Sequence, residues 1–124
     1  MSTLKPFDPM PKETFHLPVE MAVIVPSTKN IKDPIGEDEF EKRTNEVRRK
    51  LIQLFGGNTT VKGVGGYRLE GKEIREDVNM VYSYSKRADW VKNRQKLLEY
   101  LQKKKKEWSQ EKVGVIWETD LYYI

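Results

Sequence analysis

Acidic residues in two stretches of the chain are the groups best suited to catalysis or metal binding. Glu76 and Asp77 are adjacent, and Glu118 and Asp120 lie two residues apart near the end of the sequence. Carboxylates can bind Mg²⁺ or Mn²⁺ for phosphoryl chemistry or divide acid and base roles between them. Because side chains alternate along a strand, Glu76 and Asp77 should point to opposite faces, whereas Glu118 and Asp120 can share one. Glu76, Glu118 and Asp120 are thus candidate metal ligands, but charged strand ends beside turns are the simpler interpretation, and we predict neither metal nor cofactor.

A second group of interest is the basic segment 86–112, in which ten Lys or Arg residues face four acids. Its charge of +6 exceeds the net +4 of the whole chain. A basic helix can follow a phosphate backbone, each contact adding salt-dependent affinity. The alternative is a solvated helix end, which the helix dipole favours. The predicted nucleic-acid-binding residues are Lys92, Lys96, Lys103, Lys104, Lys105 and Lys106.

Aromatic residues near the ends of two expected strands could form a binding face. Tyr82, Tyr84 and Trp117 could stack bases on an open sheet face, as aromatic residues do in RNA-binding modules. They could equally belong to the core or to a dimer interface, and the sequence does not show which sheet face they occupy. Tyr82 or Tyr84 could also lie in the pocket of a metal-free enzyme.

Composition excludes several classes of site. The chain has no cysteine, and its one histidine is His16. Disulfide frameworks, thiolate chemistry and histidine-based metal triads are therefore excluded. No apolar run is long enough to span a bilayer, so we expect a soluble, cytoplasmic protein without membrane association.

Local patterns predict the elements that would position these residues. Residues 19–25 form an apolar run typical of a buried strand, and 37–55 show helical spacing with acids in the first turn. Residues 59–69 and 76–85 predict a hairpin whose turn is 70–73, and the three glycines at 63, 65 and 66 suggest a bulged edge strand. A second helix is expected at 86–111 and a last strand at 112–118.

This order, βαββαβ, predicts an α+β fold with a four-stranded antiparallel sheet and two helices on one face. It resembles the ferredoxin-like superfold and, within it, the dimeric α+β-barrel proteins, which bury the open sheet face against a second copy. The resemblance implies a homodimer. With 124 residues, the chain fits one domain at 19–124, preceded by a Pro-rich arm at 1–18.

From these observations we predict a small basic binding protein that is not an enzyme and that acts through its second helix on nucleic acid or an acidic protein surface. One alternative is a small enzyme with a site on the open sheet face, either a metal-dependent phosphodiesterase or nuclease or a metal-free barrel enzyme. Another is a structural or inhibitory protein-interaction module.

Overall fold

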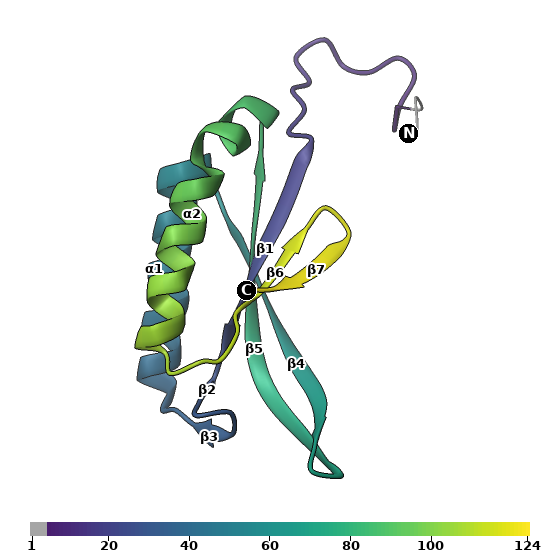
Figure 1. Cartoon of the computed structure of the whole chain (residues 1–124). Coiled ribbons are helices and arrows are strands. Elements are labelled where there is room, and N and C mark those ends of the chain that lie inside the picture. Colours follow the sequence, from purple (N-terminus) through teal and green to yellow (C-terminus); the bar gives the residue numbers. More distant parts are fainter. Residues whose placement is uncertain (1–4) are drawn as a thin grey trace.

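The computed structural model describes residues 5–124 and contains two helices packed on one side of an antiparallel sheet (Figure 1). The sheet has five strands in the order β4-β5-β1-β6-β7, and a separate two-stranded ribbon pairs β2 with β3. The α+β class is therefore confirmed, but the sheet has one strand more than predicted and does not close into a barrel. The bounds of the elements are β1 Val19–Pro26, β2 Thr28–Lys29, β3 Asp33–Pro34, α1 Glu37–Phe55, β4 Thr59–Leu69, β5 Lys72–Ser85, α2 Arg87–Glu107, β6 Gly114–Trp117 and β7 Asp120–Tyr123.

The fifth strand, β7, results from a turn that sequence patterns did not reveal. Glu118 adopts a φ of 58°, and the chain reverses there so that Asp120 pairs with Trp117. Leu121 and the two tyrosines that follow it have the aromatic and branched character that suits a strand. The predicted strand 112–118 is accordingly shorter, and the residues after it form a hairpin with it instead of a free tail.

The first helix agrees with its sequence signals. α1 spans the predicted residues, and Gly56 follows it with a φ of 95°, its amide donating to the main-chain oxygen of Ile52 at 2.8 Å. Glycine accepts this left-handed conformation without a Cβ penalty. The second helix ends earlier than predicted, at Glu107, and the chain then turns at Ser109, whose φ is 51°.

The hairpin of β4 and β5 is longer and more regular than expected. Its turn consists of Glu70 and Gly71, both with positive φ, as in the tight turns that match strand twist. Pairing runs without interruption from Thr59 opposite Tyr82 to Leu69 opposite Lys72. The predicted bulge is therefore absent.

The core lies between the sheet and the helices. Alternate residues of β1 point toward α1 and α2, and their partners in β5 and β6 do the same. The core cluster consists of Met21, Val23, Val25, Val47, Leu51, Leu54, Phe55, Val81, Leu97, Leu101, Trp108, Val113 and Val115. No helix within residues 5–124 combines the length and apolar character that crossing a bilayer requires.

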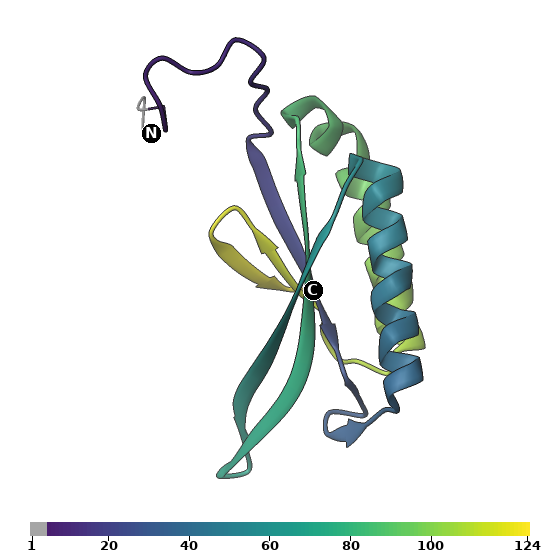
Figure 2. The same ribbon diagram turned by 180° about the vertical axis from the view of Figure 1, so that it is seen from behind.

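The part of the predicted arm that the structure describes, residues 5–18, contains no helix or strand. It leaves β1 on the side of the sheet opposite the helices (Figures 1 and 2). Residues 1–4 of the predicted arm lie outside the part of the chain that the structure describes.

Candidate functional site

The sheet face turned away from the helices carries the central aromatic residues. Ile24 lies opposite Met80 across the β1–β5 pair, and Glu20 lies opposite Tyr84. Their neighbours Val23 and Val81 are fully buried in the helix-facing core. Because adjacent residues of a strand point to opposite faces, Met80, Tyr82 and Tyr84 lie on the open face.

A groove of about 500 Å³ crosses this open face between the β4–β5 hairpin and the C-terminal strands. Glycines of β4 form one wall, and Glu76, Val78 and Met80 of β5 lie beside it. The opposite side includes Ile24 and Tyr123. We refer to this feature as the open-face groove.

Two glycines provide the space for the groove's side chains. A Cβ added at Gly63 would lie 3.3 Å from the Met80 Cε, and one added at Gly114 would lie 3.1 Å from the Ile24 Cδ1. Neither position has a positive φ, so the glycines are explained by close side-chain approach and not by backbone conformation. Larger residues at either position would displace the groove lining.

One carboxylate, Glu76, is held in the groove wall. The Thr28 hydroxyl donates to Glu76 Oε2 at 2.7 Å, and Glu76 is half-buried. Nearby, the Tyr67 hydroxyl donates to the main-chain oxygen of Ile31 at 2.7 Å. Burial, with a further contribution from the charge of Glu76, raises the pKa of Tyr67. The segment after β1 thus orients two polar side chains of the groove, those of Glu76 and Tyr67.

This combination of groups suits a ligand with a flat apolar ring and a positive charge. A carboxylate fixed beside apolar side chains attracts a cation, and aromatic faces add to that attraction. Gln110, Glu111 and Lys112 also line the groove and add a polar region with one charge of each sign. Met80 contributes a polarisable thioether that packs well against rings. Glu76 is among the residues that the sequence indicates, whereas Thr28, Tyr67 and Tyr123 are not. Loop residues and edge tyrosines have no local pattern that links them to Glu76.

The structure does not bring the three candidate metal ligands together. The amide of Glu118 donates to the main-chain oxygen of Glu20, which lies opposite Tyr84. Tyr84 is eight residues from Glu76 along β5, or about 26 Å at the rise of a strand. Asp120 lies on β7 beside Trp117. Within residues 5–124, no three acidic or histidine side chains are grouped so that they could hold a metal ion.

The predicted aromatic set is also divided. Trp117 lies opposite Met21, a helix-facing core residue, and its ring is 6.1 Å from that of Trp90 in α2. Trp90 in turn stacks on Phe55 at 5.5 Å. Trp117 is therefore on the helix side of the sheet, away from Tyr82 and Tyr84 on the open face.

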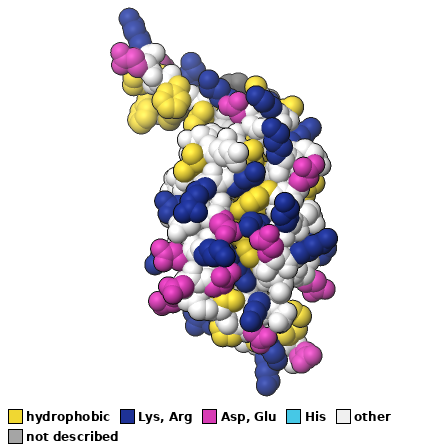
Figure 3. Space-filling model, turned by 90° about the vertical axis from the view of Figure 1, so that its left-hand side faces the viewer, with side chains coloured by type: hydrophobic (Ala, Val, Ile, Leu, Met, Phe, Trp, Pro, Cys, Tyr) yellow, Lys and Arg dark blue, Asp and Glu magenta, His cyan; other side chains and the backbone are white. Residues whose placement is uncertain are grey.

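Four of the six predicted lysines of α2 share one exposed face, and Lys104 and Lys105 lie away from it. Lys104 Nζ lies 2.6 Å from Glu46 and 2.8 Å from Glu107, and its side chain is only 13% exposed. At 100° per residue, Lys92 shares a helix face with the three exposed residues Lys96, Lys103 and Lys106. Lys104 and Lys105 point away from that face. Figure 3 views the helix side and shows basic and acidic side chains interspersed across it.

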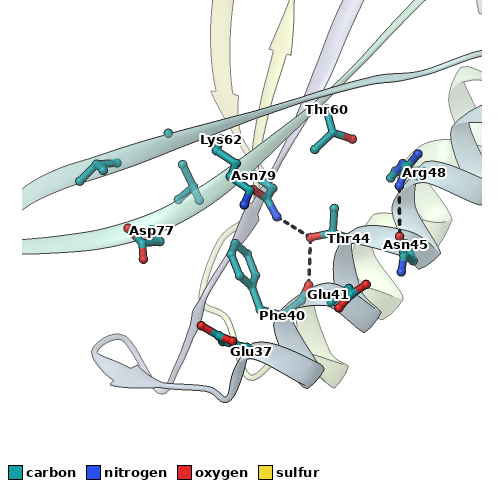
Figure 4. A pocket seen from close by; sticks show the side chains of 13 residues that line it. Glu37, Phe40, Glu41, Thr44, Asn45, Arg48, Thr60, Lys62, Asp77 and Asn79 are labelled. Atoms are coloured by element: carbon teal, nitrogen blue, oxygen red, sulfur yellow. Dashed lines mark hydrogen bonds between the residues drawn. The ribbon is translucent and has the colours of Figure 1, made fainter.

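A second hollow, of about 750 Å³, lies between α1 and the outer strands (Figure 4). Its inner polar groups bond to one another: Asn79 Nδ2 donates to the Thr44 hydroxyl at 3.0 Å, and that hydroxyl donates to the main-chain oxygen of Phe40 at 2.9 Å. Arg48 similarly donates to Asn45 at 3.3 Å. Charges of both signs lie around its rim, so the hollow has no single electrostatic preference for a ligand.

The fold of this chain is similar to that of solved structures of an enzyme. Neither a family model nor a curated protein matches the sequence. Among solved structures, a phage SAM lyase in complex with S-methyl-5′-thioadenosine superposes with a TM-score of 0.57 at 18% identity, covering 86% of this chain and 88% of that one. The apo state of a phage SAM lyase gives a TM-score of 0.58 at 18% identity, covering 86% and 87% of the two chains.

The prediction of a binding protein that is not an enzyme is therefore corrected. The similar structures are those of an enzyme that binds a small nucleoside, and Lys104, one of the six predicted lysines, is paired with Glu46 and Glu107. The lysine-rich composition of α2 was misleading, because composition does not show which lysines are paired. Glu46 of α1 and Glu107 of α2 neutralise the charge of Lys104.

Proposed function

We propose that this protein is a small enzyme that acts on a sulfonium compound carrying an adenosyl group, and that the open-face groove is its substrate site. The observation that carries the proposal is Glu76, a carboxylate that Thr28 fixes beside the apolar side chains of β1 and β5 in the groove. The similarity to phage SAM lyase extends over most of both chains and supports the choice of ligand. As part of the same proposal, we assign the βαββαβ core to the ferredoxin-like superfold, with β7 as an addition.

The chemistry of a sulfonium substrate is compatible with such a simple site. When the carboxylate oxygen of S-adenosylmethionine attacks the carbon on the amino-acid side of its sulfur, a carbon–oxygen bond forms as the carbon–sulfur bond breaks. The bonding electrons stay on sulfur, a neutral thioether, S-methyl-5′-thioadenosine, leaves, and the amino-acid part becomes a lactone. No proton has to be delivered to this leaving group. A carboxylate beside the sulfonium stabilises the charged ground state, so we assign Glu76 to substrate binding and not to bond breaking.

Tyr67 and Tyr123 would form the aromatic part of the site. Each phenol offers a ring face to the adenine or to the sulfonium. The Tyr67 hydroxyl donates to the main-chain oxygen of Ile31, which fixes the position of the ring. Both tyrosines line the groove with Glu76.

The proposal is tested by comparing a charged and a neutral ligand. Calorimetric titrations with S-adenosylmethionine and with S-methyl-5′-thioadenosine should show binding of both, and mass spectrometry should show conversion of the first into the second. In Glu76→Gln, we expect affinity for the sulfonium to fall about tenfold or more, equivalent to about 1.4 kcal/mol, with a smaller effect on the neutral thioether.

Glu118→Gln is the matched control, because Glu118 is also a half-buried carboxylate but lies far from the groove along the sheet. It should leave both affinities unchanged. If the wild-type protein binds neither compound at millimolar concentration and produces no thioether, the proposed function is wrong.

A further inference from the structure

A separate cleft of about 350 Å³ lies on the helix side of the sheet, between α2 and the hairpin of β6 and β7. A cavity of this size suits a small organic molecule. Val115 belongs to the helix-facing core and lies opposite Tyr122, so this α2–β7 cleft is on the other side of the sheet from the open-face groove. Its apolar and aromatic walls include Trp90, Leu98 and Leu101 of α2 and Val115, Trp117 and Tyr122 of the hairpin.

Two tryptophans give the cleft an aromatic wall. The rings of Trp90 and Trp117 lie 6.1 Å apart at 30° to each other, and both side chains are half-buried. Phe55, which is buried, stacks on Trp90 at 5.5 Å and holds that ring in place. Leu98 and Tyr122, which line the same cleft, remain 36% and 48% exposed. Because rings pack on one another in tilted or offset arrangements, this wall favours an aromatic ligand.

The polar groups of the cleft suit an anion. Arg94 follows Trp90 by one helical turn, is exposed to solvent, and takes part in none of the ion pairs of residues 5–124. It is the one charged side chain among the lining residues that the structure describes. The indole N–H of Trp117 is buried and has no acceptor within the described part of the chain. Since buried donors are almost always paired, this N–H is suited to a ligand oxygen.

We propose that the α2–β7 cleft binds a small aromatic monocarboxylate. Its ring would lie against Trp90 and Trp117, and its carboxylate oxygens would accept hydrogen bonds from Arg94 and from the Trp117 indole. A guanidinium can donate two parallel hydrogen bonds to a carboxylate, and such charge-assisted bonds are about twice as strong as neutral ones. The inference is independent of the proposed function, because the two sites lie on opposite faces of the sheet.

NMR titration of the isotope-labelled full chain with phenylpropionate tests the proposal. The three tryptophans give three indole N–H signals, which substitution of each by phenylalanine assigns. We expect the Trp117 signal to shift saturably, with a dissociation constant at or below about one millimolar. Trp108 is the internal control, because it is 3% exposed, does not line the cleft and should not shift. Phenylpropanamide, which is neutral, should bind about tenfold more weakly. Cyclohexylpropionate, which has no aromatic ring, should also bind more weakly.

Arg94→Gln should reduce affinity for phenylpropionate about tenfold and leave affinity for the amide unchanged. Lys92→Gln is the matched control, since Lys92 is an exposed cation of α2 that points about 160° away from Arg94. It should change neither affinity. Trp117→Phe keeps a ring but removes the N–H, and calorimetry should show about threefold weaker binding of both ligands. Circular dichroism should show all variants folded.

A Trp117 signal that does not move overturns the proposal, as do equal affinities for the acid and the amide, or equal weakening by Lys92→Gln and Arg94→Gln. If cyclohexylpropionate binds as tightly as phenylpropionate, the assignment of an aromatic ligand is wrong. Displacement of phenylpropionate by S-methyl-5′-thioadenosine would also overturn the inference, because the two ligands are assigned to opposite faces. A chain that binds S-methyl-5′-thioadenosine but not phenylpropionate would overturn this inference alone and leave the proposed function standing.

Discussion

The Thr28 hydroxyl donates a 2.7 Å hydrogen bond to Glu76 Oε2, and this bond joins the loop after β1 to the wall of the open-face groove. Thr28 is buried, with 6% of its surface exposed, so water does not readily replace its hydroxyl. The orientation of the groove's carboxylate is therefore a property of tertiary structure, set by residues 48 positions apart in the chain.

Replacing Thr28 tests whether this orientation matters for the ligand. In Thr28→Val, which preserves shape, we expect affinity for S-adenosylmethionine to fall about three- to tenfold, because the carboxylate loses its fixed position. The expected loss of stability is about 1 kcal/mol, the usual contribution of one such hydrogen bond. Thr28→Ser retains the hydroxyl and should bind as the wild type does. Equal calorimetric affinities in all three proteins would show that the bond has no role in binding.

Arg43 should be among the most important polar residues for stability. It is 3% exposed, and its guanidinium donates to main-chain oxygens of Pro26 at 3.0 Å, Thr28 at 2.8 Å and Trp108 at 3.3 Å. Arg43→Met leaves these buried carbonyls with fewer donors, and we expect a loss of about 2 to 4 kcal/mol in urea unfolding. Arg49→Met, at an exposed position of the same helix, should cost less than about 0.5 kcal/mol. Comparable losses in the two variants would contradict this assignment.

Tyr100 should make stability depend on pH in the alkaline range. Burial is the main cause that raises the pKa of Tyr100 to about 12; the charge of Lys104 opposes the shift, and those of Glu46 and Glu107 add to it. The unfolded phenol ionises near pH 10, so the folded state holds its proton more tightly. The stabilisation is complete below about pH 10 and is lost as pH rises toward 12.

The measurement for Tyr100 is urea unfolding of wild type and Tyr100→Phe at pH 8 and about pH 11. Because the buried Tyr100 hydroxyl has no hydrogen-bond partner in the described residues, Tyr100→Phe should be no less stable at pH 8. Its stability should decline less than that of the wild type at the higher pH. Parallel declines would show that another group is responsible.

The two faces of the sheet should respond differently to loss of an aromatic ring. Trp117→Ala removes a side chain packed on Trp90, and we expect a cost of about 2 to 3 kcal/mol for this half-buried position. Tyr84→Ala, on the open face, should cost less than about 1 kcal/mol. If Tyr84→Ala proved the more destabilising, the assignment of faces would be reversed.

Local sequence patterns determined the α+β class, the full span of α1, its glycine terminus and the first strand of the long hairpin. These features depend on the spacing of apolar side chains, on β-branched residues and on glycine at a positive φ, all of which act within a few residues. Alternation also grouped Met80, Tyr82 and Tyr84 on one side of their strand. It could not show which side faced the helices.

That choice belongs to the tertiary structure. Asn79 and Ser83 are small and polar, a composition that does not favour packing against a helix layer, yet they face it. Asn79 donates to Thr44 at 3.0 Å, and Ser83 donates to the main-chain oxygen of Gly57 at 2.8 Å. These bonds satisfy the buried polar groups and leave the larger aromatic residues on the open face. The pairing of Lys104 with Glu46 is also decided by the tertiary structure. A carboxylate 58 residues away in the sequence determines whether this lysine is free to bind a ligand.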